Sequence, residues 1–163
     1  MEASITLKQI GKTFSQATLL ADLSFGVEKG STLVILGENG SGKSVVLKLL
    51  VGLIEKDAGS AYIHGKDIST RSEEIRSLTG YMPQLIDLDD ELTVLENLQI
   101  FGQLHGLSYE RSNIYSLNWA KQLNLSKVLN QMPQDLSYGN QRLVQFARSL
   151  VHNPEVILLD DND

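Results

Sequence analysis

The chain is organised around the stretch Thr32-Leu33-Val34-Ile35-Leu36, which leads into Gly37-Glu38-Asn39-Gly40-Ser41-Gly42-Lys43-Ser44. The largely apolar first part predicts a buried strand, and the residues after Ser44 have helical spacing. Between them lies the pattern G-x-x-x-x-G-K-[S/T], whose small glycines let backbone N–H groups converge on an anion at a helix start. We therefore predict a phosphate-binding loop at 37–44, in which Lys43 reaches the phosphates and Ser44 holds Mg²⁺. An accidental glycine-rich turn is the alternative, and it is disfavoured by the strand before and the helix after.

Composition indicates a globular protein. The chain has 163 residues, 42% hydrophobic and 21% charged, which is enough for one domain with a packed core. A net charge of −6 and the lack of a basic stripe argue against a nucleic-acid partner. Cysteine is absent, which excludes disulfides, cysteine metal ligands and thiol catalysis.

The histidines and the apolar runs argue against a histidine metal site and against a membrane-spanning helix. His64, His105 and His152 are far apart in the sequence and have no metal-ligand spacing, so we expect structural or solvent-exposed roles for them. The longest apolar run, 45–54, is interrupted by Lys48 and is too short to cross a bilayer. We expect a soluble chain, for which any work at a membrane needs a partner.

The first half of the chain predicts mostly strands. We expect strands at 5–10 and 19–27 joined by a loop at 11–16, then strands at 32–36, 60–64 and 77–82. One helix interrupts them after the phosphate-binding loop. Its predicted apolar side consists of Val46, Leu47, Leu50, Val51 and Ile54.

The second half predicts helices. Thr93 and Glu96 have capping-box spacing, and a second helix is expected from about Tyr109 to Leu123, with Trp119 as a packing residue. A third begins near Gly139. Its predicted core face consists of Leu143, Phe146, Ala147 and Leu150, and the final apolar run 156–159 is typical of a strand covered on both faces.

Two further positions can carry chemistry. Asp160 ends an apolar strand, where a carboxylate can orient the water shell of a Mg²⁺ ion held by Ser44. Ser137 and Gly139 lie at a helix start and could bind a second anion through a hydroxyl and open backbone. An ordinary serine N-cap explains the same residues.

Four motifs together resemble the ATP-binding-cassette (ABC) ATPase family. They are the phosphate-binding loop, Tyr81-Met82-Pro83-Gln84, Leu136-Ser137-Tyr138-Gly139-Asn140-Gln141 and Val156 to Asp160, in the family's order and separations. The resemblance implies an α/β P-loop NTPase fold with N-terminal antiparallel strands, a mainly parallel core sheet and a helical subdomain. It implies a single domain over 1–163, with a catalytic core at 1–84 and 139–163, a helical subdomain at 85–138 and a signature motif at 136–142.

The resemblance also implies roles for individual residues. Gln84 would contact Mg²⁺ and the attacking water, Phe14 would stack on adenine, and Asp161 stands where the family has its catalytic glutamate. Ser137 and Gly139 would contact the γ-phosphate of ATP held by an opposite subunit. The nucleotide itself would be bound by Gly37, Glu38, Asn39, Gly40, Ser41, Gly42, Lys43 and Ser44, with Mg²⁺ held by Ser44, Gln84 and Asp160.

The function implied by the resemblance is that of an ATP-binding subunit of an ABC transporter, weakly similar to ABC-2 type exporters. Two cassettes, identical or different, would meet head to tail, and a membrane permease would dock on 85–138. The chain would then be cytoplasmic and peripheral at the inner face of a membrane. A cassette that binds ATP without turnover and a soluble ABC protein of translation or DNA repair are the alternatives.

Several residues depart from the family's pattern. Tyr138 and Asn140 replace a glycine and a glutamine of the signature. Asp161 is shorter than glutamate by about 1.5 Å, and a base misplaced by about 1 Å can lose about 100-fold in rate. Family members continue past the position of Asp163, and their next strand lies between those matching 32–36 and 156–160. We therefore expect an incomplete cassette with unpaired central backbone and little ATPase activity.

Overall fold

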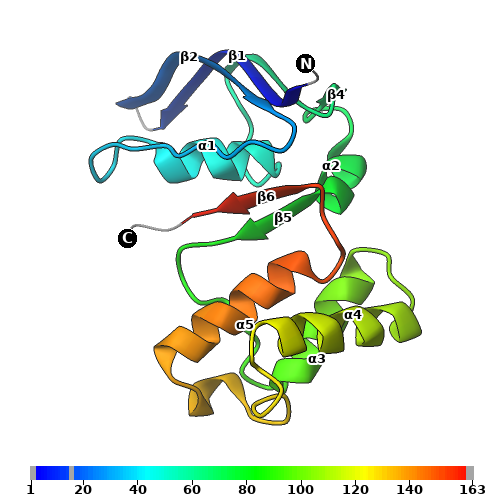
Figure 1. Cartoon of the computed structure of the whole chain (residues 1–163). Coiled ribbons are helices and arrows are strands. Elements are labelled where there is room, and N and C mark those ends of the chain that lie inside the picture. The colour runs from blue at the N-terminus through cyan, green and yellow to red at the C-terminus, as the bar shows by residue number, and fades with distance from the viewer. Residues whose placement is uncertain (1–2, 15–16, 161–163) are drawn as a thin grey trace. The chain divides into compact units, whose positions relative to one another are not determined.

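The computed structural model describes residues 3–14 and 17–160. By its internal contacts the chain divides into two compact units, Met1–Arg76 and Ser77–Asp163. Figure 1 shows the elements of both units. These two units have other bounds than the predicted catalytic core at 1–84 and 139–163 and helical subdomain at 85–138. That predicted division is not tested by the units and stays a prediction.

An antiparallel sheet dominates the first unit. Its strands have the order β2-β1-β3-β4, and β1 pairs with β2 on one side and β3 on the other. The strands predicted at 5–10 and 19–27 are confirmed, and both are longer than predicted: β1 continues into the expected loop as far as Phe14, which pairs with Ala17 at the start of β2. The strand bounds are Ala3–Phe14 for β1, Ala17–Glu28 for β2, Ala58–Ile63 for β3 and Lys66–Asp67 for β4.

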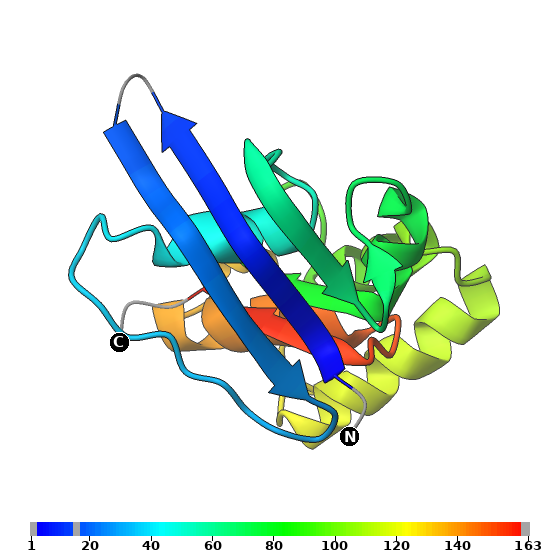
Figure 2. The same cartoon turned by 90° about the horizontal axis from the view of Figure 1, so that it is seen from above.

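Helix α1, Lys43–Leu50, packs on one face of this sheet (Figure 2). It buries Val46, Leu49 and Leu50. The prediction of an apolar face reaching Ile54 is wrong, because the helix ends with Val51 as its C-cap and Gly52 follows at φ 73°. A residue with positive φ ends a right-handed helix.

A tight turn and a short helix lead out of the sheet. His64 and Gly65 have φ of 48° and 71° and form a two-residue turn between Ile63 and Lys66, so the strand predicted at 60–64 ends one residue earlier, at Ile63. Helix α2, Ser72–Leu78, was not foreseen, and it includes the first two residues of the strand predicted at 77–82. Glu73 and Glu74 in its first turn favour a helix start.

The stretch predicted as a buried strand at 32–36 is irregular, which corrects the sequence analysis. Leu33, Val34 and Leu36 are 48%, 68% and 88% exposed. A strand needs neighbours for its backbone N–H and C=O groups, and no strand of the described residues pairs with this stretch. Hydrophobicity alone therefore does not place it in the sheet.

The second unit has a parallel strand pair and three longer helices (Figure 1). The two strands pair in register, with Met82 beside Leu159. Gly80 lies so close to the Ser149 carbonyl of the last helix that a Cβ would not fit. The bounds are Thr79–Met82 for β5, Val94–Leu104 for α3, Tyr109–Gln122 for α4, Tyr138–Leu150 for α5 and Val156–Leu159 for β6. A short 3₁₀ helix, Pro133–Asp135, precedes α5.

Strand β6 is confirmed, but it is covered on one face only. Val156 and Leu158 are buried, whereas Ile157 and Leu159 are 47% and 50% exposed. A continuous apolar run is compatible with a strand that is buried on both faces. The run alone does not show that other elements cover both faces.

The helices of this unit begin as predicted. Thr93 caps α3 in a capping box with Glu96, and Ser108 caps α4. Trp119 packs against the core between the helices, which confirms its expected role. The buried members of that core are Val94, Leu98, Ala120, Leu125, Leu136, Val144, Ala147 and Val151.

The buried face of α5 differs from the prediction. Ala147 and Leu150 are buried as predicted, but Leu143 is 39% exposed, whereas Val144 is fully buried and Gln145 is 1% exposed. The expected face was chosen by hydrophobicity, but Gln145 is buried because its amide finds hydrogen-bond partners. The rings of His105 and His152, distant in sequence, stack with centroids 4.0 Å apart.

Candidate functional site

The phosphate-binding loop connects an irregular segment directly to α1. The Ser41 N–H donates to the Glu38 carbonyl at 3.2 Å, and the Val46 N–H donates to the Gly42 carbonyl at 3.1 Å. Gly42 has φ 93°, and a Cβ on it would lie 3.0 Å from a methyl carbon of Leu20. Glycine is thus required at this position by both backbone conformation and space.

Lys43 folds back onto this loop. Its Nζ donates to the carbonyls of Gly37 and Glu38, each at 2.8 Å. No side chain caps the start of α1 at Gly42, and the first turn of this described helix carries no acidic residue. A lysine ammonium and uncapped N–H groups at a helix N-terminus together favour an anion.

Phe14 ends β1 and is 42% exposed. The Nζ of Lys12 lies 5.0 Å from the centre of its ring. Asp57 accepts hydrogen bonds from Lys12 Nζ and the Thr13 N–H, both at 2.8 Å, and these two donors lower the pKa of its carboxyl. An exposed ring on an anchored strand end can stack on a flat ligand, so the proposed adenine contact remains open to test.

Asp160 is a buried carboxylate at the carboxyl end of β6. It is 5% exposed, its N–H donates to the Met82 carbonyl at 2.9 Å, and its Oδ2 accepts from the Tyr81 hydroxyl at 3.1 Å. Burial, and next the charge of Asp160, raises the pKa of Tyr81. Tyr81 therefore stays a proton donor to this carboxylate over the physiological pH range.

Gln84 reaches the same end of the strand pair. Met82 and Leu159 pair in parallel, so the two residues after Met82 leave the sheet beside the residue after Leu159. Two predicted site residues, Gln84 and Asp160, thus come from neighbouring strand ends. This is the arrangement expected of parallel strands.

Ser137 is the N-cap of α5. Its Oγ accepts from the Asn140 N–H at 3.3 Å, which matches the ordinary capping alternative. Tyr138 is 69% exposed, and no heavy atom lies within 4 Å of the position that a Cβ on Gly139 would take. The backbone at the helix start is therefore open, and contact with a second anion stays a prediction. Asp161 lies outside the described residues.

The residues predicted to hold Mg²⁺ are oxygen donors of the kind that a nucleotide-bound magnesium ion uses. In the described part of the chain, no three acidic, histidine or cysteine residues gather into a metal site. Mg²⁺ commonly uses only one or two protein carboxylates and takes its other oxygens from phosphates and water. The Asp160 carboxylate in the second unit and the Ser44 hydroxyl in the first are each oxygen donors of the kind that Mg²⁺ binds.

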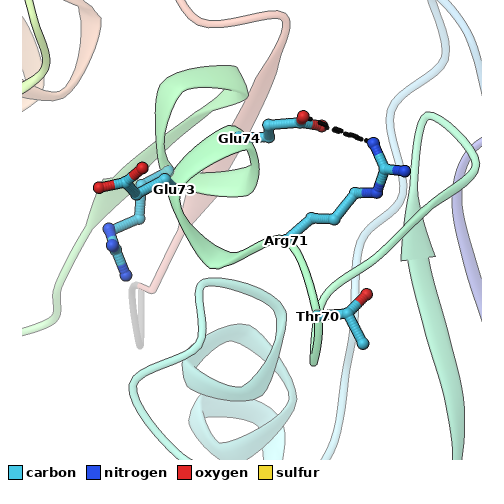
Figure 3. A pocket seen from close by; sticks show the side chains of 5 residues that line it. Thr70, Arg71, Glu73 and Glu74 are labelled. Carbon is cyan, nitrogen blue, oxygen red and sulfur yellow. Dashed lines mark hydrogen bonds and ion pairs between the residues drawn. The ribbon is translucent and has the colours of Figure 1, made fainter.

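A shallow pocket in the first unit holds none of the predicted site residues. It is lined by Thr70, Arg71, Glu73, Glu74 and Arg76 (Figure 3). Glu74 pairs with Lys66 at 2.7 Å and with Arg71 at 3.3 Å. Exposed pairs of this kind contribute little and give the pocket no evident ligand.

None of the described helices combines the length and hydrophobicity that crossing a membrane requires.

Two kinds of known protein resemble the chain. The Nod factor export ATP-binding protein I of Burkholderia lata is 33% identical over 98% of this chain and 52% of its own length, and that of Cupriavidus pinatubonensis is 34% identical over 99% and 50%. The chain thus spans about half the length of the curated relatives it matches. A solved dimeric structure of the ATP-binding cassette MJ0796, in a post-hydrolysis state bound to ADP and Pi, is 27% identical with a TM-score of 0.86. That match covers 95% of this chain and 72% of the cassette.

The family model described as "ABC transporter" matches residues 20–162. That range includes the phosphate-binding loop, Gln84, Ser137 and Asp160. It confirms the fold class expected from the sequence, an ABC cassette of the P-loop NTPase type. The chain belongs to the ABC transporter family.

Proposed function

We propose that this chain binds Mg-ATP and acts as an ATP-binding subunit of an ABC transporter. The observation that carries the proposal is the phosphate-binding loop, where Gly42 adopts a conformation that only glycine fits and Lys43 is held at the loop carbonyls. A phosphate would replace those carbonyls as the partner of the ammonium, because an anion pairs with a cation more strongly than a carbonyl dipole does.

Each predicted site residue has a role in this proposal. Backbone N–H groups of 37–44 and the start of α1 bind the phosphates, while Phe14 stacks on adenine. Ser44, Gln84 and Asp160 hold Mg²⁺, which neutralises phosphate charge when bound. The Tyr81 hydroxyl holds the Asp160 carboxylate in one orientation. Asp161, one residue on, is the proposed general base for hydrolysis.

Two solved structures support a proposal for the assembly. The MJ0796 cassette is dimeric, and cbiO1 of Clostridium perfringens is part of the ABC transporter complex cbiONQ. We propose a head-to-tail dimer of cassettes in which Ser137 and Gly139 serve the nucleotide of the partner. A membrane permease docking on 85–138 would place the chain at the cytoplasmic face of a membrane. Turnover would distinguish this function from that of a cassette that only binds ATP.

Titration calorimetry tests the phosphate-binding loop. Lys43→Ala should weaken Mg-ATP binding by at least about tenfold, since a charge-assisted hydrogen bond is worth about 1.5–3 kcal/mol. The matched control is Lys48→Ala, which removes the same charge from the last turn of the same helix. The wild-type affinity should survive in the control. Equal affinities of the wild type and Lys43→Ala would reject the assignment of the loop.

A further inference from the structure

Three side chains of α5 hold the backbone that carries Gln84. The central one is Gln145, which is 1% exposed. Its Nε2 lies 3.1 and 2.8 Å from the carbonyl oxygens of Pro83 and Leu85 and 3.1 Å from Oδ1 of Asp87, so its two N–H hydrogens are shared among three acceptors. A buried amide with three acceptors in one short segment leaves little freedom to that segment.

Two arginines extend the contact on either side. Arg142 Nη1 donates to the carbonyls of Pro83 and Gln84 at 3.0 and 2.9 Å. Arg148 Nη1 donates to the Asp87 carbonyl at 2.9 Å, and its Nη2 pairs with the Asp87 carboxylate. These residues recur every third position and therefore share one side of the helix. We refer to Arg142, Gln145 and Arg148 as the polar face of α5, and to residues 83–87 as the Gln84 segment.

The Gln84 segment depends on these contacts for its shape. It is neither helix nor strand, and the Leu85 side chain is 77% exposed, so apolar packing does not anchor that position. The carbonyls of Pro83, Gln84, Leu85 and Asp87 instead accept from the polar face of α5. The helix thus determines where this backbone lies.

The same helix begins at Ser137. A helix of this length moves as one body, so its N-cap and its polar face cannot shift independently. We propose that Gln145, with Arg142 and Arg148, is a positioning residue for Gln84 and couples the Gln84 segment to the helix start at Ser137. The effect of this coupling on nucleotide binding rests on the proposed function. The restraint of the Gln84 segment by α5 can be tested without nucleotide.

Spin labelling tests the mechanical part. The chain contains no cysteine, so Leu85→Cys gives a single site for a nitroxide label. In that background Gln145→Met keeps the side-chain length and removes the amide, and the label should become clearly more mobile. Gln141→Met is the matched control, because the Gln141 amide donates to the Pro133 carbonyl at 2.8 Å on the same helix. The control should leave the label unchanged.

A variant with a smaller structural effect separates the loss of these contacts from a general folding defect. Asp87→Asn weakens the ion pair with Arg148 at a side chain that is 51% exposed, and leaves the core intact. The nitroxide at position 85 should become more mobile in Asp87→Asn than in the labelled wild type, but less mobile than in Gln145→Met. Equal label mobility in the wild type and both variants would overturn the proposal.

Calorimetric titration of Mg-ATP tests the action through Gln84. Gln145→Met should weaken Mg-ATP binding about three- to tenfold, and should have no further effect in a Gln84→Ala background. An effect that persists without the Gln84 side chain would show a purely structural role and would overturn the proposal. If the wild type binds no Mg-ATP, the proposed function fails together with this coupling to nucleotide, while the label result still decides whether α5 holds the segment.

Discussion

The phosphate-binding loop and the Gln84 segment are both irregular backbone, yet they are held in different ways. Residues 37–44 take their shape from glycine conformations and from Lys43 bonding to carbonyls of its own loop. The Gln84 segment takes its shape from Arg142 and Gln145, which are distant in sequence. Local chemistry organises one proposed site region, and long-range side-chain contacts organise the other.

The surroundings of the two regions differ as well. The apolar residues before the phosphate-binding loop are exposed, with Leu36 at 88%, whereas the helices of the second unit share a core in which Leu98 is fully buried. The free energy of unfolding should therefore depend strongly on the helical core of the second unit and weakly on the segment at 32–36.

Truncating a core leucine should have the largest effect. Leu98→Ala should lower the free energy of unfolding by about 2–5 kcal/mol, because it removes buried methyl groups and leaves a cavity. Leu36→Ala makes the same chemical change at an exposed site and should stay within about 0.5 kcal/mol of the wild type. Urea unfolding followed by circular dichroism measures both. Similar losses in the two variants would show that Leu36 is packed after all.

Acid should destabilise the second unit through His152. Burial, followed by the nearby His105, lowers the pKa of His152 from 6.5 to about 4, while the hydrogen bond with the Thr79 carbonyl opposes the shift. The unfolded chain then binds a proton that the folded one does not, so stability falls as the pH drops from about 6.5 towards 4. The full loss is on the order of 3 kcal/mol.

Thermal unfolding at pH 7 and pH 5 measures this loss, with His152→Gln as the comparison. The variant lacks the titrating ring, so its stability should depend less on pH over this interval. A pH dependence as steep in His152→Gln as in the wild type would assign the effect to other groups.

Adding a methyl group to the phosphate-binding loop should have a smaller effect. Gly42→Ala forces an L-residue to φ 93° beside Leu20 and should cost about 2 kcal/mol. Gly40→Ala has a similar φ of 82° but open space, and should cost about 1 kcal/mol. Melting temperatures of the two variants separate crowding from backbone strain. The reverse order would mean that the loop does not pack on β2 as described.

Helix capping should give the smallest effect. Thr93→Ala removes the two hydrogen bonds of the Thr93 hydroxyl with Glu96, leaves the Thr93 N–H bonded to the Glu96 carboxylate, and should cost about 1 kcal/mol. Ser108→Ala removes the capping bond from the Arg111 N–H on α4, at 3.3 Å, and a bond with Glu110, and should cost about the same. Chemical unfolding of both variants measures the two losses. No loss of stability in either variant would show that its capping bonds do not stabilise the helix.

Sequence reasoning succeeded where a motif is local. The capping box at Thr93 and the helix that follows the loop at 37–44 each depend on neighbouring residues, and both were predicted as observed. Phosphate binding by that loop stays a prediction. Hydrophobic pattern located β6 and α4 for the same reason.

Sequence reasoning failed where contacts between residues distant in sequence determine the structure. The segment at 32–36 has the composition of a strand but no pairing strand among the described residues, and Gln145 is buried only because the distant carbonyls of Pro83 and Leu85 accept its amide. The recurrence of Arg142, Gln145 and Arg148 on one helix side was the available signal for these contacts. It could not identify the backbone that they bind.

Magnesium dependence is the most direct test of the central claim, that the loop binds phosphate while Asp160 serves the metal. ATP affinity should be measured by calorimetry with Mg²⁺ and with EDTA, for the wild type, Lys43→Ala and the isosteric Asp160→Asn. We expect Lys43→Ala to weaken ATP binding in both conditions, and Asp160→Asn to weaken it only with Mg²⁺. Loss of affinity in Asp160→Asn with EDTA, or undiminished affinity in Lys43→Ala, would contradict it.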